Sequence, residues 1–365
     1  MARSLRRRRR SPGVRRVRKA ASALTDGLKL AMGLASATLK AMTPKAAKPS
    51  GTAKKVTKPA RRATGTASPG ASFRAGSYDC EHGARRYKLF MPGIAADAKP
   101  LPLLVMLHGC GQTTDDFARG TRMNALAAEF GFIVLYPAQP REANPNRCWN
   151  WFSRDDQFRD AGEPALLAGL TRHIVDRHGA DPGRVYVAGL SAGASAALIL
   201  AGAYPEVFAA VGVHSGLPAG AARDQASAVM AMQRGNPGWR LGHPKPTIIF
   251  HGSRDHVVHP RNGRLVAIRA REPYASLRGT EVEGRVPGGH PYVKIVHRIG
   301  SGRPLVEHWI VTGSGHAWSG GLSTGRFTDP KGPDASRQMV RFFLRNSLST
   351  RQRAALAPGG TTGPE

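Results

Sequence analysis

The sequence predicts an α/β fold: a mostly parallel β-sheet with helices on both faces. From about Ser72 onward, short apolar runs rich in Val, Ile and Leu alternate with stretches of helix-forming residues, which is the pattern of strand–helix–strand units. The pentapeptide Gly189–Gly193 (GLSAG) stands between an apolar run and a helical run, as at a sharp strand-to-helix turn. The chain has 365 residues, of which 41% are hydrophobic, so it is long and apolar enough for a sizeable core.

The expected elements follow from the apolar patterning of each segment. Strands are expected at 87–91, 103–107, 132–136, 185–190, 209–214, 247–250, 292–298 and 306–311. Helices are expected at 114–130, 164–178, 192–204 and 335–348, and a long polar and aromatic loop at 137–163. In such sheets functional groups lie at the carboxyl ends of the strands, so catalytic residues are sought in the loops that follow strands.

The N-terminal segment 1–72 differs from the rest in charge. It holds 19 Lys and Arg residues and one acid, a net +18 of the chain's +30. Its Lys/Ala/Pro/Thr-rich part cannot bury enough apolar area to offset chain entropy, which predicts disorder. Apolar residues spaced by three and four at 20–42 predict one amphipathic helix within it. A catalytic domain is expected at 73–348 and a disordered C-terminal tail at 349–365.

The same segment bears on location and partners. Asp26, Lys29 and Lys40 interrupt the apolar stretch that an export signal would need, which favours a cytoplasmic protein over a secreted one. A basic tail of this kind can hold an anionic surface, a polymer granule or nucleic acid; the alternative is a solvated tail without a specific partner. No apolar run reaches the length of a membrane-spanning helix.

Ser191, at the centre of the pentapeptide, is the candidate nucleophile. A serine on a strand-to-helix turn holds its hydroxyl out of the sheet, and small residues around it relieve the crowding of that turn. A second match, Gly321–Gly325 with Ser323, has no apolar strand before it and no helical run after it. We therefore interpret Ser323 as a loop residue.

A serine hydroxyl needs a base, and the base needs an orienting acid. Asp255 follows the strand at 247–250, and His316 follows the strand at 306–311 in a Gly-rich loop. The order Ser, Asp, His is that of α/β-hydrolases. His290, in a Gly-Gly-His-Pro sequence, is the rival histidine; the competing acids are Asp224, Asp329 and Asp334.

The oxyanion of an ester's tetrahedral intermediate needs preorganised N–H donors. One is expected from Ala192, directly after the nucleophile, and the other from the loop His108–Gln112 that follows an early strand. Within that loop we predict the N–H of Cys110, and we interpret the His108 side chain as a structural support. The three cysteines and scattered histidines lack zinc-site spacing, so no metal or other cofactor is expected.

With these residues in place, the chain resembles the polyhydroxybutyrate (PHB) depolymerase family of esterases, which are similar to feruloyl and acetyl-xylan esterases. The segments that carry the resemblance are 103–112 (LLVMLHGCGQ), 148–152 (CWNWF), 181–193 (DPGRVYVAGLSAG), 251–255 (HGSRD) and 315–318 (GHAW). The resemblance implies an α/β-hydrolase domain that cleaves esters with Ser191, Asp255 and His316.

The resemblance also suggests roles for other residues. Cys110 and Cys148 would pin the oxyanion loop to the tryptophan-rich loop if they were bridged, and the sequence leaves a disulfide and two free thiols equally open. Trp149, Trp151 and Trp318 are expected to line the substrate surface, the alternative being core packing, which we expect for at least one of them.

The expected function is therefore hydrolysis of short-chain hydroxyalkanoate esters or poly(3-hydroxybutyrate) oligomers by a Ser-His-Asp acyl-enzyme mechanism. One alternative keeps the chemistry but acts on feruloyl or acetyl groups of polysaccharides. Another, from a different class, is a surface or nucleic-acid binding protein that acts through the basic tail.

Overall fold

The computed structural model describes residues 70–93, 99–240 and 242–359, which form a sheet covered by helices. The sheet has ten strands in the order β1-β2-β4-β3-β5-β6-β7-β10-β9-β8. Their bounds are β1 Ser72–Cys80, β2 Gly83–Met91, β3 Leu103–Leu107, β4 Ile133–Pro137, β5 Val185–Leu190, β6 Ala210–His214, β7 Thr247–Gly252, β8 Arg278–Arg285, β9 Pro291–Arg298 and β10 Val306–Val311.

The centre of the sheet is parallel and its two edges are antiparallel. Strands β4, β3, β5, β6, β7 and β10 run parallel to one another. The β1–β2 hairpin and the β8–β9 hairpin extend the sheet on either side by antiparallel pairing. Because parallel strands end at one edge, the loops that follow β3, β5, β6, β7 and β10 gather at that edge.

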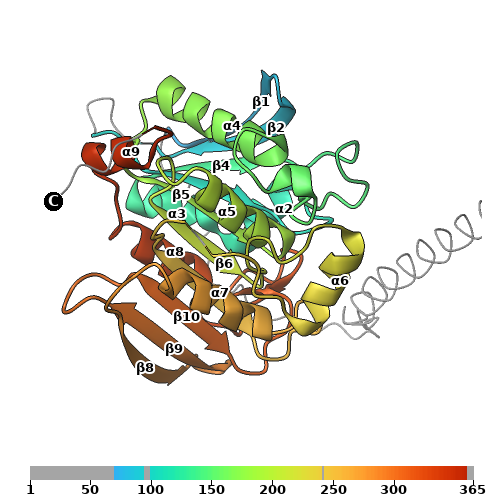
Figure 1. Cartoon of the computed structure of the whole chain (residues 1–365), viewed down its shortest axis with the longest axis vertical. Coiled ribbons are helices and arrows are strands. Elements are labelled where there is room, and N and C mark those ends of the chain that lie inside the picture. The colour runs from blue at the N-terminus through green and yellow to red at the C-terminus, as the bar shows by residue number, and fades with distance from the viewer. Residues whose placement is uncertain (1–69, 94–98, 241, 360–365) are drawn as a thin grey trace, which may run out of the picture. The chain divides into compact units, whose positions relative to one another are not determined.

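Helices cover both faces of this sheet (Figure 1). One face packs against α4 (Gly162–His178), α5 (Ala192–Ala203), α6 (Gln225–Arg234) and α7 (Arg261–Arg271). The other packs against α2 (Thr114–Thr121), α3 (Met123–Phe130) and α8 (Ala335–Phe343). No helix in the described residues is both long enough and apolar enough to cross a membrane.

Strand β3 illustrates how the two cores are built. Its five residues are all buried, and successive side chains point to opposite faces. Leu103, Val105 and Leu107 join the core beneath α4 and α5, while Leu104 and Met106 join the core beneath α3 and α8. This burial on both faces is why a continuous apolar run, rather than an alternating one, marks the central strands.

The single helix expected at 114–130 is two helices. Arg122 between them adopts left-handed backbone angles, with φ 56° and ψ 22°. Its guanidinium donates to the Gly320 carbonyl and to Asp334 Oδ2, at 3.2 and 2.8 Å. These distant contacts hold the break, and no local signal at Arg122 predicts them.

The expectation of a disordered C-terminal tail at 349–365 is wrong for its first half, because Thr350–Leu356 forms helix α9. Ser349 accepts from the Gln352 N–H and Gln352 Oε1 accepts from the Ser349 N–H, which makes a capping box that starts the helix. The predicted amphipathic helix at 20–42 and the rest of the basic segment 1–69 lie outside the described residues.

Candidate active site

Ser191 lies on a tight turn between β5 and α5. Its φ of 56° and ψ of −119° are unusual for a residue with a side chain, and such strain is characteristic of functional positions. The turn is held because the Ser191 N–H donates to the His214 carbonyl at the end of β6, at 2.8 Å. The strand–turn–helix context expected around Ser191 is therefore present.

The glycines of the pentapeptide allow α5 to approach the sheet. A Cβ on Gly193 would lie 2.1 Å from the Leu107 carbonyl oxygen, and a Cβ on Gly189 would lie 2.4 Å from the Gly193 carbonyl. Only glycine fits at such distances. The helix thus begins directly against the end of β3, which brings Ser191 to the loop that starts at His108.

The second pentapeptide has a different environment. Ser323 is exposed in a turn between the two-residue strands β11 (Trp318–Ser319) and β12 (Thr328–Asp329). A Cβ on Gly325 would lie 2.3 Å from Gly120 Cα, so that glycine permits loop packing. The interpretation of Ser323 as a loop residue is confirmed.

Asp255 and His316 come together although 61 positions separate them. His316 Nδ1 lies 2.7 Å from Asp255 Oδ2. The carboxylate also accepts the N–H groups of Val257 and Val258 on Oδ1, both at 2.9 Å, and His251 Nε2 lies 3.4 Å from its Oδ2. Burial would raise the pKa of Asp255, but the nearby His316 charge and the imidazole hydrogen bonds outweigh it and hold that pKa well below its usual value.

The loops that carry these two residues are tied together. They follow β7 and β10, which pair in parallel. The Arg254 N–H donates to the Ser314 carbonyl and the Gly313 N–H donates to Ser253 Oγ, both at 2.9 Å. Register and loop contacts together therefore fix the aspartate–histidine pair.

The rival histidine and the competing acids have other contacts. His290 Nε2 lies 2.9 Å from Asp329 Oδ2, and Ser314 Oγ donates to the same oxygen at 2.7 Å. This second acid–histidine pair thus holds the loop of the first. Asp224 and Asp334 cap the N-termini of α6 and α8 through their side chains.

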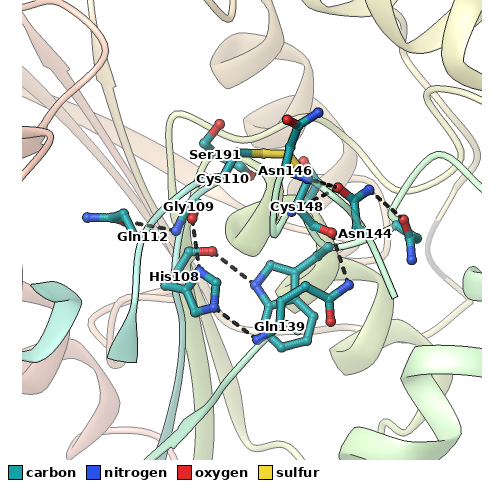
Figure 2. Close-up of a disulfide and its surroundings, with 12 residues drawn as sticks. His108, Gly109, Cys110, Gln112, Gln139, Asn144, Asn146, Cys148 and Ser191 are labelled. Atoms are coloured by element: carbon teal, nitrogen blue, oxygen red, sulfur yellow. Dashed lines mark hydrogen bonds between the residues drawn. A yellow bond between two sulfur atoms is a disulfide. The ribbon is translucent and has the colours of Figure 1, made fainter. Parts of the chain in front are cut away.

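A disulfide between Cys110 and Cys148 joins the loop after β3 to the loop after β4 (Figure 2). The two Cα atoms lie 4.2 Å apart. The Gly111 N–H donates to the Asn146 carbonyl at 2.8 Å beside the bridge. Of the two alternatives that the sequence left open, the structure therefore has the bridge. The third cysteine, Cys80, is a free thiol.

The backbone N–H groups of Gly109, Gly111 and Gln112 in the loop after β3 have internal acceptors. The Gly109 N–H donates to Gln112 Oε1 at 2.9 Å, and the Gln112 N–H donates to the Gly109 carbonyl at 3.2 Å. Among the described residues, no acceptor receives the N–H of Cys110 or of Ala192. These two N–H groups are the ones that the sequence predicts as oxyanion donors.

All three tryptophans are buried, so the expectation that at least one belongs to the core is confirmed and the expectation that they line the substrate surface is not met. Trp149 and Trp318 are 0% exposed and Trp151 is 5% exposed. The Trp149 indole N–H donates to the His108 carbonyl, and that of Trp318 donates to Ser336 Oγ, both at 2.9 Å. Large amphipathic rings with an internal partner for their N–H are stable in the core, so these side chains support the loops from beneath.

Gln139 is a hub beneath the two bridged loops that the sequence did not reveal. Its N–H donates to His108 Nε2 at 3.1 Å and its Nε2 donates to the Cys148 carbonyl at 3.0 Å. It also donates to Glu163, and its Oε1 accepts from Arg85 at 2.6 Å. Its only sequence signal is that it follows strand β4.

Three buried histidines make the fold sensitive to acid. Burial lowers the pKa of His108 to about 4, and of His214 and His308 to about 3. Between pH 6.5 and 4 the unfolded chain therefore binds protons that the folded chain does not, so the free energy of unfolding falls as pH falls. Burial raises the pKa of Glu163 to about 7. Between pH 7 and 4.5 the folded chain therefore binds a proton at Glu163 that the unfolded chain does not, which raises the free energy of unfolding as pH falls. The three histidines outweigh this single group.

We accordingly expect urea unfolding at pH 5 to give a free energy of unfolding several kcal/mol below that at pH 7, since each proton contributes up to about 1.4 kcal/mol per pH unit. His308→Gln should make this pH dependence shallower, because His308 lies in β10 and is buried. A stability that is constant or rises toward pH 5 would contradict the expectation.

Comparison with known proteins places the sequence in a family. The sequence model of the family described as "Esterase PHB depolymerase" matches residues 85–267. Poly(3-hydroxyalkanoate) depolymerase C of Paucimonas lemoignei is 35% identical, over 63% of this chain and 57% of its own length. Feruloyl esterase B of Neurospora crassa is 31% identical, over 59% of this chain and 77% of its own length.

Solved structures agree on the fold. Acetyl xylan esterase from Aspergillus awamori superposes with a TM-score of 0.57 at 20% identity, covering 74% of this chain and 98% of that protein. An S-formylglutathione hydrolase from Agrobacterium tumefaciens gives 0.50 at 16% identity, covering 76% and 96%. The fold is that of the α/β-hydrolases, and the chain belongs to the PHB depolymerase family of esterases.

Proposed function

We propose that this protein is a serine esterase in which Ser191, His316 and Asp255 act as a catalytic triad within a catalytic domain at 73–348. The observation that carries the proposal is the 2.7 Å contact between His316 Nδ1 and Asp255 Oδ2, on loops at the same sheet edge as the Ser191 turn. An aspartate on Nδ1 leaves Nε2 of the imidazole to act as the base toward a serine.

The reaction proceeds by acyl transfer. His316 takes the proton of the Ser191 hydroxyl as its oxygen attacks the ester carbonyl carbon, and the carbonyl oxygen becomes an oxyanion. The N–H groups of Cys110 and Ala192 donate to that oxyanion. His316 then gives its proton to the leaving alkoxide, and water, activated by the same imidazole, hydrolyses the acyl-enzyme. Asp255 orients the imidazole and stabilises its charged form.

The proposed substrates are esters of short-chain 3-hydroxyalkanoates and their oligomers. The 35% identity to a poly(3-hydroxyalkanoate) depolymerase supports this class. Feruloyl or acetyl esters of carbohydrate are the alternative, supported by the 31% identity to a feruloyl esterase over 77% of that enzyme. The two differ in the acyl group and share the same attack on a carbonyl.

A matched panel separates the two classes. We expect a higher kcat/KM on 3-hydroxybutyrate dimers and trimers than on methyl ferulate or acetylated xylan, measured on the purified full-length chain by product chromatography. The reverse order would select the carbohydrate esters. Absence of hydrolysis on every ester in the panel, including p-nitrophenyl acetate and butyrate, would contradict the esterase proposal itself.

A further inference from the structure

We propose that His108 is a positioning residue: its imidazole holds the Gly109 carbonyl and thereby aims the Cys110 N–H at the oxyanion. The inference rests on the proposed function, because it assigns a role to a group behind the proposed oxyanion donor. His108 is 1% exposed, so its side chain acts from beneath the site and has no open path to substrate.

The argument begins with one peptide group. The Gly109 carbonyl and the Cys110 N–H belong to the same peptide plane, and the described residues contain no cis peptide bond. In a trans peptide these two groups point in opposite directions. Whatever holds the Gly109 oxygen inside the protein therefore turns the Cys110 hydrogen outward.

His108 makes the shorter of the two contacts to that oxygen. Its Nδ1 lies 2.9 Å from the Gly109 carbonyl oxygen, whereas the Gln112 N–H reaches it at 3.2 Å. The next residue is held separately, since Gly111 N–H donates to the Asn146 carbonyl. The loop is therefore fixed on both sides of Cys110, whereas the Cys110 N–H itself has no internal acceptor among the described residues.

The tautomer of the imidazole is set from its other side. The backbone N–H of Gln139 donates to His108 Nε2 at 3.1 Å, so Nε2 is an unprotonated acceptor. The single ring proton of the neutral imidazole then lies on Nδ1 and is donated to the Gly109 carbonyl. Figure 2 shows this chain of contacts from Gln139 through His108 to Gly109.

The surroundings of His108 keep the ring neutral and immobile. Burial lowers its pKa to about 4, and the charges of Arg147 and Arg85 act in the same direction, while the bond to Gly109 and the charge of Asp116 oppose it. The ring packs against Trp149, with centroids 5.5 Å apart, and Trp149 donates to the His108 carbonyl. The donor to Gly109 is therefore present throughout the neutral pH range.

Two amide variants separate the two nitrogens of the ring. In His108→Asn the amide can occupy the place of Nδ1 and donate to Gly109, but nothing accepts from Gln139. In His108→Gln the amide reaches the place of Nε2 and accepts from Gln139, but no donor reaches Gly109. Both replace a buried ring by a smaller amide, so general loss of packing affects both.

We expect His108→Gln to lower kcat by about 10- to 100-fold with KM changed less than about 3-fold, because a misaimed oxyanion donor acts on the transition state. The conservative His108→Asn should recover most of that loss. Affinity for an alkyl boronic acid, which forms a tetrahedral adduct on the serine, should fall in His108→Gln by the same factor as kcat/KM. Equal losses in the two variants would overturn the proposal for His108. So would wild-type kinetics in His108→Gln. If Ser191→Ala is inactive in the same assay, the proposed function stands and only the role of His108 is rejected.

A measurement on the unaltered protein covers the case in which a variant does not fold. The ¹⁵N chemical shifts of the His108 ring at pH 7, assigned by sequential connectivity, should show a protonated Nδ1 and an unprotonated Nε2. A protonated Nε2 would overturn the proposal, since such a ring cannot donate to Gly109. By contrast, activity retained in Ser191→Ala would overturn the proposed function.

Discussion

Ser191→Ala should lower kcat/KM for a p-nitrophenyl short-chain ester by about 10⁴-fold or more, to the level that the oxyanion donors and binding alone support. Alanine keeps the turn between β5 and α5 but removes the only hydroxyl that the proposed mechanism uses. The measurement is the initial rate at substrate concentrations well below KM, with the folded state checked by near-UV circular dichroism.

Ser323→Ala is the matched control for this experiment. Ser323 has the same sequence context of flanking glycines, yet it lies in an exposed turn that contacts Gly120 through its neighbours. We expect wild-type kinetics from this variant. If the two variants exchanged these results, the nucleophile would be Ser323.

Asp255→Asn should reduce kcat by about 10⁴-fold, with a smaller effect on KM. The asparagine amide can present a donor toward His316 Nδ1 and thereby favour the wrong tautomer, in which Nε2 carries the proton and cannot take one from Ser191. The loss should persist across the pH range in which the protein is folded, and the steady-state rates on p-nitrophenyl butyrate measure it.

Asp329→Asn provides the comparison, because Asp329 also contacts a histidine, His290, at 2.9 Å. That pair supports the loop through Ser314, so its neutralisation should cost no more than about 10-fold in kcat. A larger loss at Asp329 than at Asp255 would contradict the assignment of the acid.

The central strands could be predicted because burial on both faces requires a continuous run of apolar residues, which is visible in the sequence. Three of them, Leu103–Leu107, Val185–Leu190 and Val306–Val311, begin and end where the sequence indicates. Strand β8 was missed for the opposite reason. Seven of its eight residues are exposed, so Arg278–Arg285 carries no apolar pattern, and only pairing with β9 makes it a strand.

Some residues of the candidate site could be predicted from the sequence and others could not. Chain order and position after strands predicted that Asp255 and His316 lie together, because topology alone brings the ends of parallel strands to one edge. The tryptophans were misplaced because an aromatic composition says nothing about which side of a loop faces the core. The network around Gln139 could not be predicted, since its contacts with Arg85, His108 and Glu163 join segments far apart in the sequence.

The bridge between Cys110 and Cys148 divides the long loop between β4 and α4 into an anchored part and a part beyond the anchor. The segment between β4 and Cys148 is anchored by the bridge, by Gln139 and by the Asn146 carbonyl. The segment from Ser153 to Ala161 lies beyond that anchor and joins α4. The covalent path from Cys110 to Cys148 does not run through that segment. We therefore expect sequence changes there to leave Cys110 in place, except at Asp156, which accepts the Glu163 N–H and so touches the network beneath the bridge.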